Sequence, residues 1–118
     1  MKWENGLSVQ EVLEELKQKD PSLQLKIGLG NPMSYRGYYE CLAFGPHENV
    51  TVQTMMEIIT KCIGDTFQGY KGGDYTMDTD TETYFVASGE QCDCGEAITK
   101  YFLYWLFRDE NVVKGGTQ

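Results

Sequence analysis

A stretch of alternating apolar and polar residues, followed at once by a tyrosine-rich stretch, restricts the fold of this chain more than any other feature. The segment Leu23–Leu29 alternates leucine and isoleucine with polar residues or glycine, and a period of two places every second side chain on one face of a β-strand. The segment 35–44 predicts a second strand. We expect the two strands to pair as an antiparallel hairpin with a loop at 30–34, and Gly45-Pro46 to end the second strand.

Two amphipathic helices are predicted on either side of these strands. Ser8 opens a capping-box sequence ahead of an apolar stripe, which predicts a helix over 8–19. Thr51 is suited to an N-cap and Gly64 to a position just past a helix C-terminus. We therefore expect a second helix over 51–63.

The C-terminal part of the chain predicts a strand over 84–87, a turn at Cys92–Gly95 and a further element over 98–107. The spacing in 98–107 fits a helix as well as a fully buried strand, and we favour the strand because Cys92–Gly95 would then be a hairpin tip. The 118 residues are expected to form one ligand-binding domain (1–118) of the α+β class. Its expected order is α-β-β-α-β-β, with two helices packed on a mostly antiparallel sheet.

The charge balance excludes some partners. Eighteen Asp and Glu face ten Lys and Arg, which gives a net charge of −8 and a pI near 4.5. Duplex nucleic acid requires clustered cations, so we expect no such partner. No apolar run is long enough to span a membrane, and we expect no secretory signal. The cysteines are then expected to be reduced thiols in a cytoplasm.

Catalytic and metal-binding patterns are not found. His47 is the single histidine and is expected in a loop, where it has no evident nucleophile to activate. Cys92 and Cys94 are closer in sequence than zinc ligands usually are. A calcium loop starting at Asp78 would need glycine at its sixth position and glutamate at its twelfth, and the chain has neither. We expect a protein that is not an enzyme and has no catalytic residues, metal site or cofactor.

Two tyrosine- and glycine-rich blocks are the remaining candidates for a binding site. The first block, SYRGYYE at 34–40, contains Arg36, one of the two arginines in the chain. A guanidinium can bind two phosphate oxygens while neighbouring rings stack on a base. The second block, GYKGGDYTM at 69–77, combines a lysine with paired glycines whose backbone N–H groups can turn toward an anion. An arrangement with the tyrosines in the core and Arg36 paired with Glu40 fits the pattern equally well.

The pair of blocks, separated by a helix, resembles small bacteriophage proteins of the Thoeris anti-defence sponge family, the first type described, over about Leu25–Met77. The resemblance implies a protein that binds cyclic ADP-ribose isomers, the alarm signals made by bacterial TIR-domain enzymes, and holds them without cleaving them. It also implies homodimers with ligand sites near the subunit interface. Some members form larger homo-oligomers and sequester cyclic oligonucleotides. The expected location is the cytoplasm of the infected bacterial host.

The resemblance also assigns roles within the two blocks. Arg36 is expected to contact the pyrophosphate, with two tyrosines as stacking platforms, Asp74 to bond a ribose hydroxyl and Met77 to line the base. Arg108 lies outside the blocks and is added on physical grounds, because it is the other guanidinium of the chain. The expected ligand-binding residues are Tyr35, Arg36, Tyr38, Gly69, Tyr70, Lys71, Gly72, Gly73, Asp74, Met77 and Arg108.

Two other functions stay open on the sequence. The net charge of −8 and the alternating acids Asp78, Asp80 and Glu82 fit an acidic inhibitor that acts on a host DNA-binding or defence protein. A small phosphodiesterase acting on the same signals would need a base or a metal site, and the sequence offers neither pattern.

Overall fold

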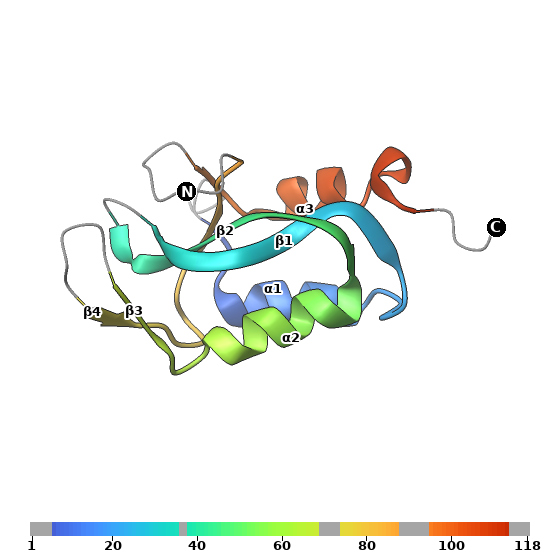
Figure 1. Ribbon diagram of the computed structural model, residues 1–118. Coiled ribbons are helices and arrows are strands. Elements are labelled where there is room, and N and C mark those ends of the chain that lie inside the picture. The colour runs from blue at the N-terminus through green and yellow to red at the C-terminus, as the bar shows by residue number, and fades with distance from the viewer. Residues whose placement is uncertain (1–5, 36–37, 69–73, 88–94, 114–118) are drawn as a thin grey trace.

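The structure, a computed structural model, describes residues 6–35, 38–68, 74–87 and 95–113, with the backbone alone at 34–35, 38–40, 66–68 and 74–75. Within these residues the chain forms three α-helices, six strands and one 3₁₀-helix (Figure 1). In order they are α1 (Val9–Lys17), β1 (Gln24–Tyr35), β2 (Tyr38–Thr51), α2 (Val52–Cys62), β3 (Thr66–Gln68), β4 (Asp74–Thr76), β5 (Thr83–Phe85), β6 (Glu96–Ala97), α3 (Lys100–Leu106) and η1 (Asp109–Asn111).

The main sheet has four strands in the order β1-β2-β5-β6. The long β1–β2 pair and the β5–β6 pair are antiparallel, whereas β2 and β5 are parallel. Strands β3 and β4 form a separate antiparallel pair. The predicted α+β class is confirmed. The predicted order α-β-β-α-β-β is correct only in outline, because the described residues add a third helix, a second small sheet and a parallel pair.

Strand β1 extends through the segment that we predicted as a loop. The prediction of a loop at 30–34 is wrong, since β1 runs to Tyr35 and the β1–β2 register shifts between Gly30 and Met33. In such a bulge one strand has extra residues that are not paired with the other strand. Asn31 lies in this bulge and has a φ of 47°.

Strand β2 likewise continues through Pro46, where we predicted its end. Leu42 donates its N–H to Glu82, and the carbonyl of Phe44 accepts from Val86, so these two residues direct their backbone groups toward β5. Pro46 lies two residues further on and directs its nitrogen to the same side, beyond the last residue paired with β5. The N–H that proline lacks therefore costs no bond in the ladder.

Helices α1 and α2 confirm the two predicted helices, and their caps are the predicted ones. Ser8 Oγ accepts from the N–H of Glu11 at 3.1 Å, and Glu11 Oε1 accepts from the N–H of Ser8 at 2.9 Å. Thr51 Oγ1 accepts from the N–H of Thr54 at 3.1 Å. Gly64 follows α2 with a φ of +88°, a conformation that glycine adopts at little cost.

The segment 98–107, which we predicted as a strand, contains helix α3. Thr99 caps it by accepting from the N–H of Phe102 at 3.1 Å. Ile98, Phe102 and Leu106 recur at intervals of four and are buried, as expected for one face of a helix. The opposite face carries the exposed residues Tyr101, Tyr104 and Trp105.

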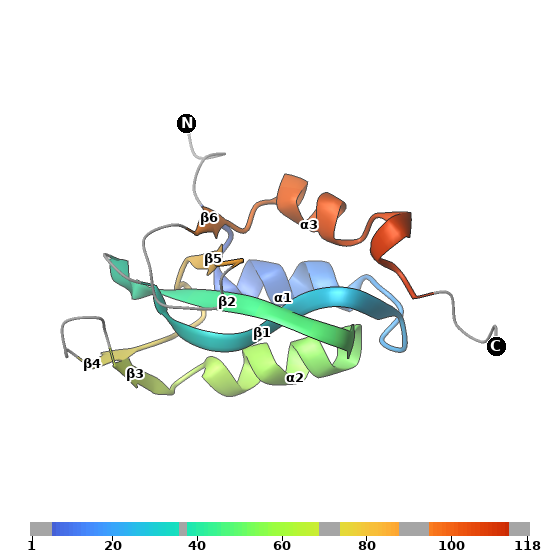
Figure 2. The ribbon, with the colours of Figure 1, turned by 45° about the horizontal axis from the view of Figure 1, so that its top comes forward.

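The three helices share one hydrophobic core with the sheet. Apolar residues of each helix gather with Leu42, Phe44 and Phe85 in a single cluster, and in Figure 2 the helices follow one another across the molecule as α2, α1 and α3. Among the described residues, no helix is both long and apolar enough to cross a membrane.

Candidate functional site

The two blocks singled out from the sequence lie at the same end of the molecule. Tyr35 at the end of β1 pairs with Tyr38 at the start of β2, and Gln68 of β3 pairs with Asp74 of β4. Strand β1 contacts β3, and β2 contacts β4. Figure 1 shows the free ends of both pairs on the left. We call this region, defined by these four residues, the hairpin end.

Three predicted ligand-binding residues, Tyr35, Tyr38 and Asp74, belong to the hairpin end, and the structure describes only their backbone. Arg36 and the segment 69–73 lie outside the described residues. The backbone positions of Tyr35, Tyr38 and Asp74 are known from the strand pairing. The roles proposed for these side chains stay predictions, while the backbone supports the proximity of the two blocks.

The β3–β4 pair is held to the end of α2 by backbone hydrogen bonds. Gly64 donates to the carbonyl of Met77 at 2.8 Å, and Met77 donates to the carbonyl of Asp65 at 3.0 Å. Because these bonds close the base of the β3–β4 pair, they fix where its other end lies relative to β1 and β2.

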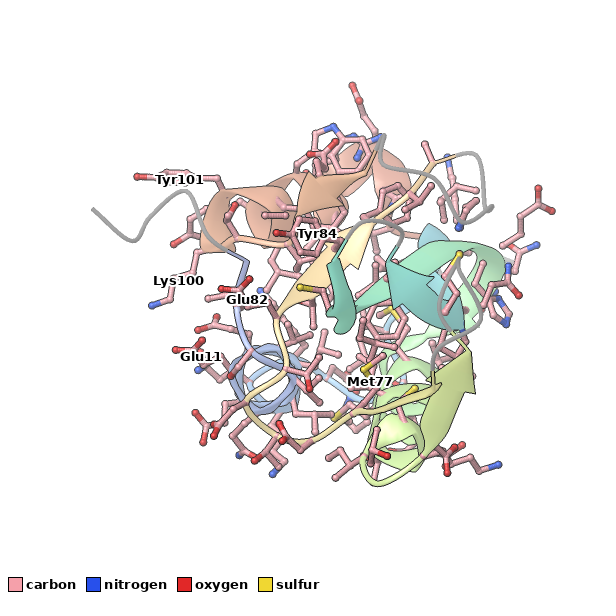
Figure 3. The ribbon with its side chains drawn as sticks, turned by 90° about the vertical axis from the view of Figure 1, so that its left-hand side faces the viewer. Glu11, Met77, Glu82, Tyr84, Lys100 and Tyr101 are labelled. Atoms are coloured by element: carbon pink, nitrogen blue, oxygen red, sulfur yellow. The ribbon has the colours of Figure 1, made fainter. Side chains whose placement is uncertain are left out.

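Met77 is a core residue in the structure. Its side chain is 1% exposed and belongs to the main hydrophobic cluster, and it lies among interior side chains in Figure 3. We predicted that it would line the base of a nucleotide. In this position it stabilises the attachment of β4 to the core and presents almost no surface to a ligand.

Arg108 is bound within its own turn, between α3 and η1. Its Nη1 donates to the carbonyl of Trp105 at 2.8 Å, and its Cζ lies 4.2 Å from the centre of the Trp105 ring. Its Nε lies 3.6 Å from Glu110 Oε1. Arg108 directly precedes η1, which lies on the right of Figure 1, whereas β3 and β4 lie on the left. The structure therefore does not bring Arg108 to the predicted site.

The described residues contain no group of three or more His, Cys, Asp and Glu side chains arranged to hold a metal ion. Cys62 is buried in α2, and its Sγ donates to the carbonyl of Ile58 at 3.3 Å. Burial, followed by the negative charge of Asp65, raises the pKa of the Cys62 thiol to about 11. This thiol is therefore protonated at neutral pH and is a poor nucleophile.

Two clefts flank α3, and the sequence analysis missed both. We call the larger one, with a volume of about 380 Å³, the α3 cleft; it is lined by Glu96, Thr99, Tyr101, Phe102 and Trp105. The smaller one, of about 260 Å³, lies between α1 and α3 and is lined by Glu15, Gln18, Lys19, Lys100, Leu103, Tyr104 and Phe107. The helical spacing in 98–107 was the signal that could have revealed an exposed aromatic face.

Comparison with known proteins gives no relative: no family model, curated protein or solved structure matches this chain. Function is therefore inferred from the residues and their placement.

Proposed function

We propose that the protein binds a cyclic ADP-ribose-type nucleotide at the hairpin end and sequesters it without cleaving it. The observation that supports this proposal is the contact of β1 with β3 and of β2 with β4. These contacts bring together two blocks that the whole of α2 separates in the sequence.

The ligand would be held by charge and by stacking. Arg36 would bind phosphate oxygens, Tyr35 and Tyr38 would stack on rings, and Lys71 with the N–H groups of Gly72-Gly73 would complete an anion site. A protein that sequesters a signal needs a dissociation constant of about 1 nM, or roughly −12 kcal/mol. Charge-assisted hydrogen bonds contribute about 1.5–3 kcal/mol each, so two such bonds and the stacked rings could supply much of this free energy.

In this proposal the protein acts as a homodimer with two equal sites in the cytoplasm of the infected host. Binding without cleavage requires no base, nucleophile or metal.

Calorimetric titration of the protein with cyclic ADP-ribose isomers tests the proposal. We expect saturation at about one ligand per chain, with unchanged ligand recovered after denaturation. Arg36→Ala is expected to weaken binding by about 10- to 100-fold, the equivalent of one charge-assisted pair. Lys26→Ala removes the same charge from an exposed position near the other end of β1 and should leave binding unchanged.

Two outcomes would contradict the proposal. Absence of binding to every nucleotide tested would remove it altogether. Recovery of a cleaved ligand would replace it with the phosphodiesterase hypothesis. If Arg36→Ala unfolds the chain, judged by circular dichroism, Arg36→Lys keeps the charge and separates a structural role from a binding role.

The exposed aromatic residues of α3 favour a second candidate function, contact with a protein partner. The acidic residues that first suggested such a function are less informative. Asp78 and Asp80 are exposed, but the carboxylate of Asp78 accepts from the N–H of Asp80 at 2.8 Å. This bond makes them part of a local turn.

A further inference from the structure

Helix α3 exposes three large aromatic side chains on seven residues. The exposed fractions are 75% for Tyr101, 72% for Tyr104 and 49% for Trp105, and Tyr101 projects away from the rest of the molecule in Figure 3. Tyrosine and tryptophan carry much of the binding energy at protein interfaces. Their concentration on one short element therefore marks a contact surface.

The α3 cleft on one side of this helix has the chemistry of a cation site. The centres of the Phe102 and Trp105 rings are 5.5 Å apart with a tilt of 43°, and Tyr101 adds a third ring to the lining. Glu96 is the charged residue among the described residues that line the cleft. Aromatic faces beside a carboxylate attract guanidinium and ammonium groups.

The size of the cleft fits a single side chain better than a large ligand. Its volume of about 380 Å³ lies near the lower limit of ligand pockets, which run from about 300 to 1,000 Å³. The other cleft, by contrast, is lined by Lys19 and Lys100 as well as Glu15, so its charges do not favour a cation.

Arg108 already provides an example of the contact. Its guanidinium lies 4.2 Å from the centre of the Trp105 ring, so this ring accepts a guanidinium in the protein itself. The pairing of Arg108 with Glu110 at 3.6 Å involves a carboxylate that is largely exposed, and an exposed pair of this kind holds a side chain only weakly. An incoming arginine would compete with Arg108 for the ring by displacing it from the hydrogen bond that its Nη1 donates to the carbonyl of Trp105 at 2.8 Å.

We propose that the α3 cleft binds an arginine side chain on an exposed segment of a basic partner protein. The chain has a net charge of −8, which attracts a basic partner at long range and raises the association rate. The cleft then supplies the specific contact through its rings and Glu96. The described residues that line the α3 cleft belong to β6, to α3 and to the cap of α3. None of them belongs to the hairpin end, so the proposal does not depend on nucleotide binding.

A second copy of the chain fits the surface less well. Helix α3 has seven residues and is only about 10 Å long. Two such helices facing each other would bury less than the roughly 1,200 Å² of a stable interface.

Trp105 fluorescence tests the proposal directly. The chain has two tryptophans, so Trp3→Phe leaves Trp105 as the single reporter. Titration of this variant with a synthetic peptide of eight arginines in 150 mM salt is expected to change the emission of Trp105 in a saturable way. A peptide of eight lysines should bind more weakly, because ammonium groups stack on rings less well than guanidinium groups.

Matched variants separate the cleft from general charge attraction. Tyr101→Ala should weaken binding about fivefold, the equivalent of one cation–π contact, whereas Tyr104→Ala, equally exposed on the same helix but lining the other cleft, should not. Glu96→Gln should weaken binding by a similar factor. Glu57→Gln, which removes the same charge from an exposed position on α2, should change it less than twofold.

The sign of the Arg108→Gln effect is the most specific prediction. This variant removes the competing guanidinium and a nearby positive charge, so binding of the arginine peptide should tighten by about two- to fivefold. Weaker binding in Arg108→Gln would overturn the proposal, since it would mean that Arg108 supports binding of the arginine peptide and does not compete with it for the ring. Equal effects of the two tyrosine variants, or of the two glutamate variants, would also overturn it. Analytical ultracentrifugation of the protein without peptide gives a further test. Self-association that Tyr101→Ala abolishes would also overturn the proposal, because a second copy of the chain would then occupy the cleft.

Discussion

At the scale of single residues, Asn111 joins the C-terminal part of the chain to the edge of the sheet. It is 4% exposed. Its Oδ1 accepts from the N–H of Ile27 at 3.1 Å, and its Nδ2 donates to the carbonyls of Ile27 at 2.8 Å and Leu106 at 2.7 Å. The Asn111 side chain thus bonds both backbone groups of Ile27, as a neighbouring strand would, and it also bonds the carbonyl of the last residue of α3.

Asn111→Ala should lower the free energy of unfolding by about 2–3 kcal/mol, because three backbone groups lose their partner. Urea denaturation followed by circular dichroism measures the change. Gln53→Ala, at an exposed position on α2, serves as the control and should shift stability by less than about 0.5 kcal/mol. Equal denaturation midpoints for wild type and Asn111→Ala would show that water replaces the side chain.

Cys62 makes stability depend on pH in the alkaline range. Its pKa is raised from 9.0 to about 11, so the unfolded chain releases this proton at a lower pH than the folded protein does. The contribution of Cys62 to stability is therefore complete below about pH 9 and is lost as the pH rises toward 11. Between pH 8 and 10.5 we expect the melting temperature to fall more in the wild type than in Cys62→Ala. Parallel curves for the two proteins would contradict this assignment.

At the scale of elements, the sequence predicted the structures whose signals are local. The capping box at Ser8 and the N-cap at Thr51 lie within four residues of the groups they bond, so helices α1 and α2 could be located without knowledge of the fold. Helix α3 was predicted wrongly because its exposed face is aromatic. Tyr101 and Trp105 remove the contrast between apolar and polar positions by which a helical face is usually recognised.

The strands show the opposite case, in which distant contacts override local signals. Pro46 would end an isolated strand, but the position of β5 decides which backbone groups of β2 need partners. The parallel pairing of β2 with β5 could not be predicted from the sequence either, since it depends on the path of the intervening chain. The same limit applies to the site, where composition could select the two blocks but not establish that β1 contacts β3.

The packing of α2 against the β1–β2 pair depends on Gly28. A Cβ at this position would collide with Val50 Cγ1 and come within 2.9 Å of Met55 Sδ. Gly28→Ala should therefore destabilise the protein by about 1–3 kcal/mol through overpacking. Thermal unfolding measures the loss.

Gly64→Ala is the matched comparison for Gly28→Ala. A Cβ on Gly64 meets nothing within 4 Å, but its φ of +88° disfavours alanine, so its cost of about 1 kcal/mol would be purely conformational. Because the nearest atom to the added Cβ is Val50 Cγ1, Val50→Ala should cost less in the Gly28→Ala background than in the wild type. No such coupling with Val50→Ala is expected for Gly64→Ala. Identical behaviour of the two glycines would rule out close packing as the reason for Gly28.

At the scale of the whole molecule, the C-terminal segment closes the open edge of the sheet. Strand β1 is the outermost strand of its sheet. Leu25 forms an isolated bridge with Val112, and the N–H of Val113 donates to the carbonyl of Gln24 at 2.8 Å. Together with Asn111, these contacts cover the first part of β1. An uncovered edge of this kind invites pairing with another chain.

Two truncations test this closure. Removal of residues 109–118 should lower the free energy of unfolding by about 3–5 kcal/mol, since several hydrogen bonds and the packing of Val112 are lost together. It should also produce concentration-dependent aggregation in light scattering, because the edge of β1 is then exposed. Removal of 114–118 alone keeps every one of these contacts and should leave both the urea midpoint and the scattering unchanged. If the longer truncation does not aggregate and keeps its midpoint, the edge of β1 is protected by something other than the C-terminal segment, and the bridge at Leu25 contributes little to the fold.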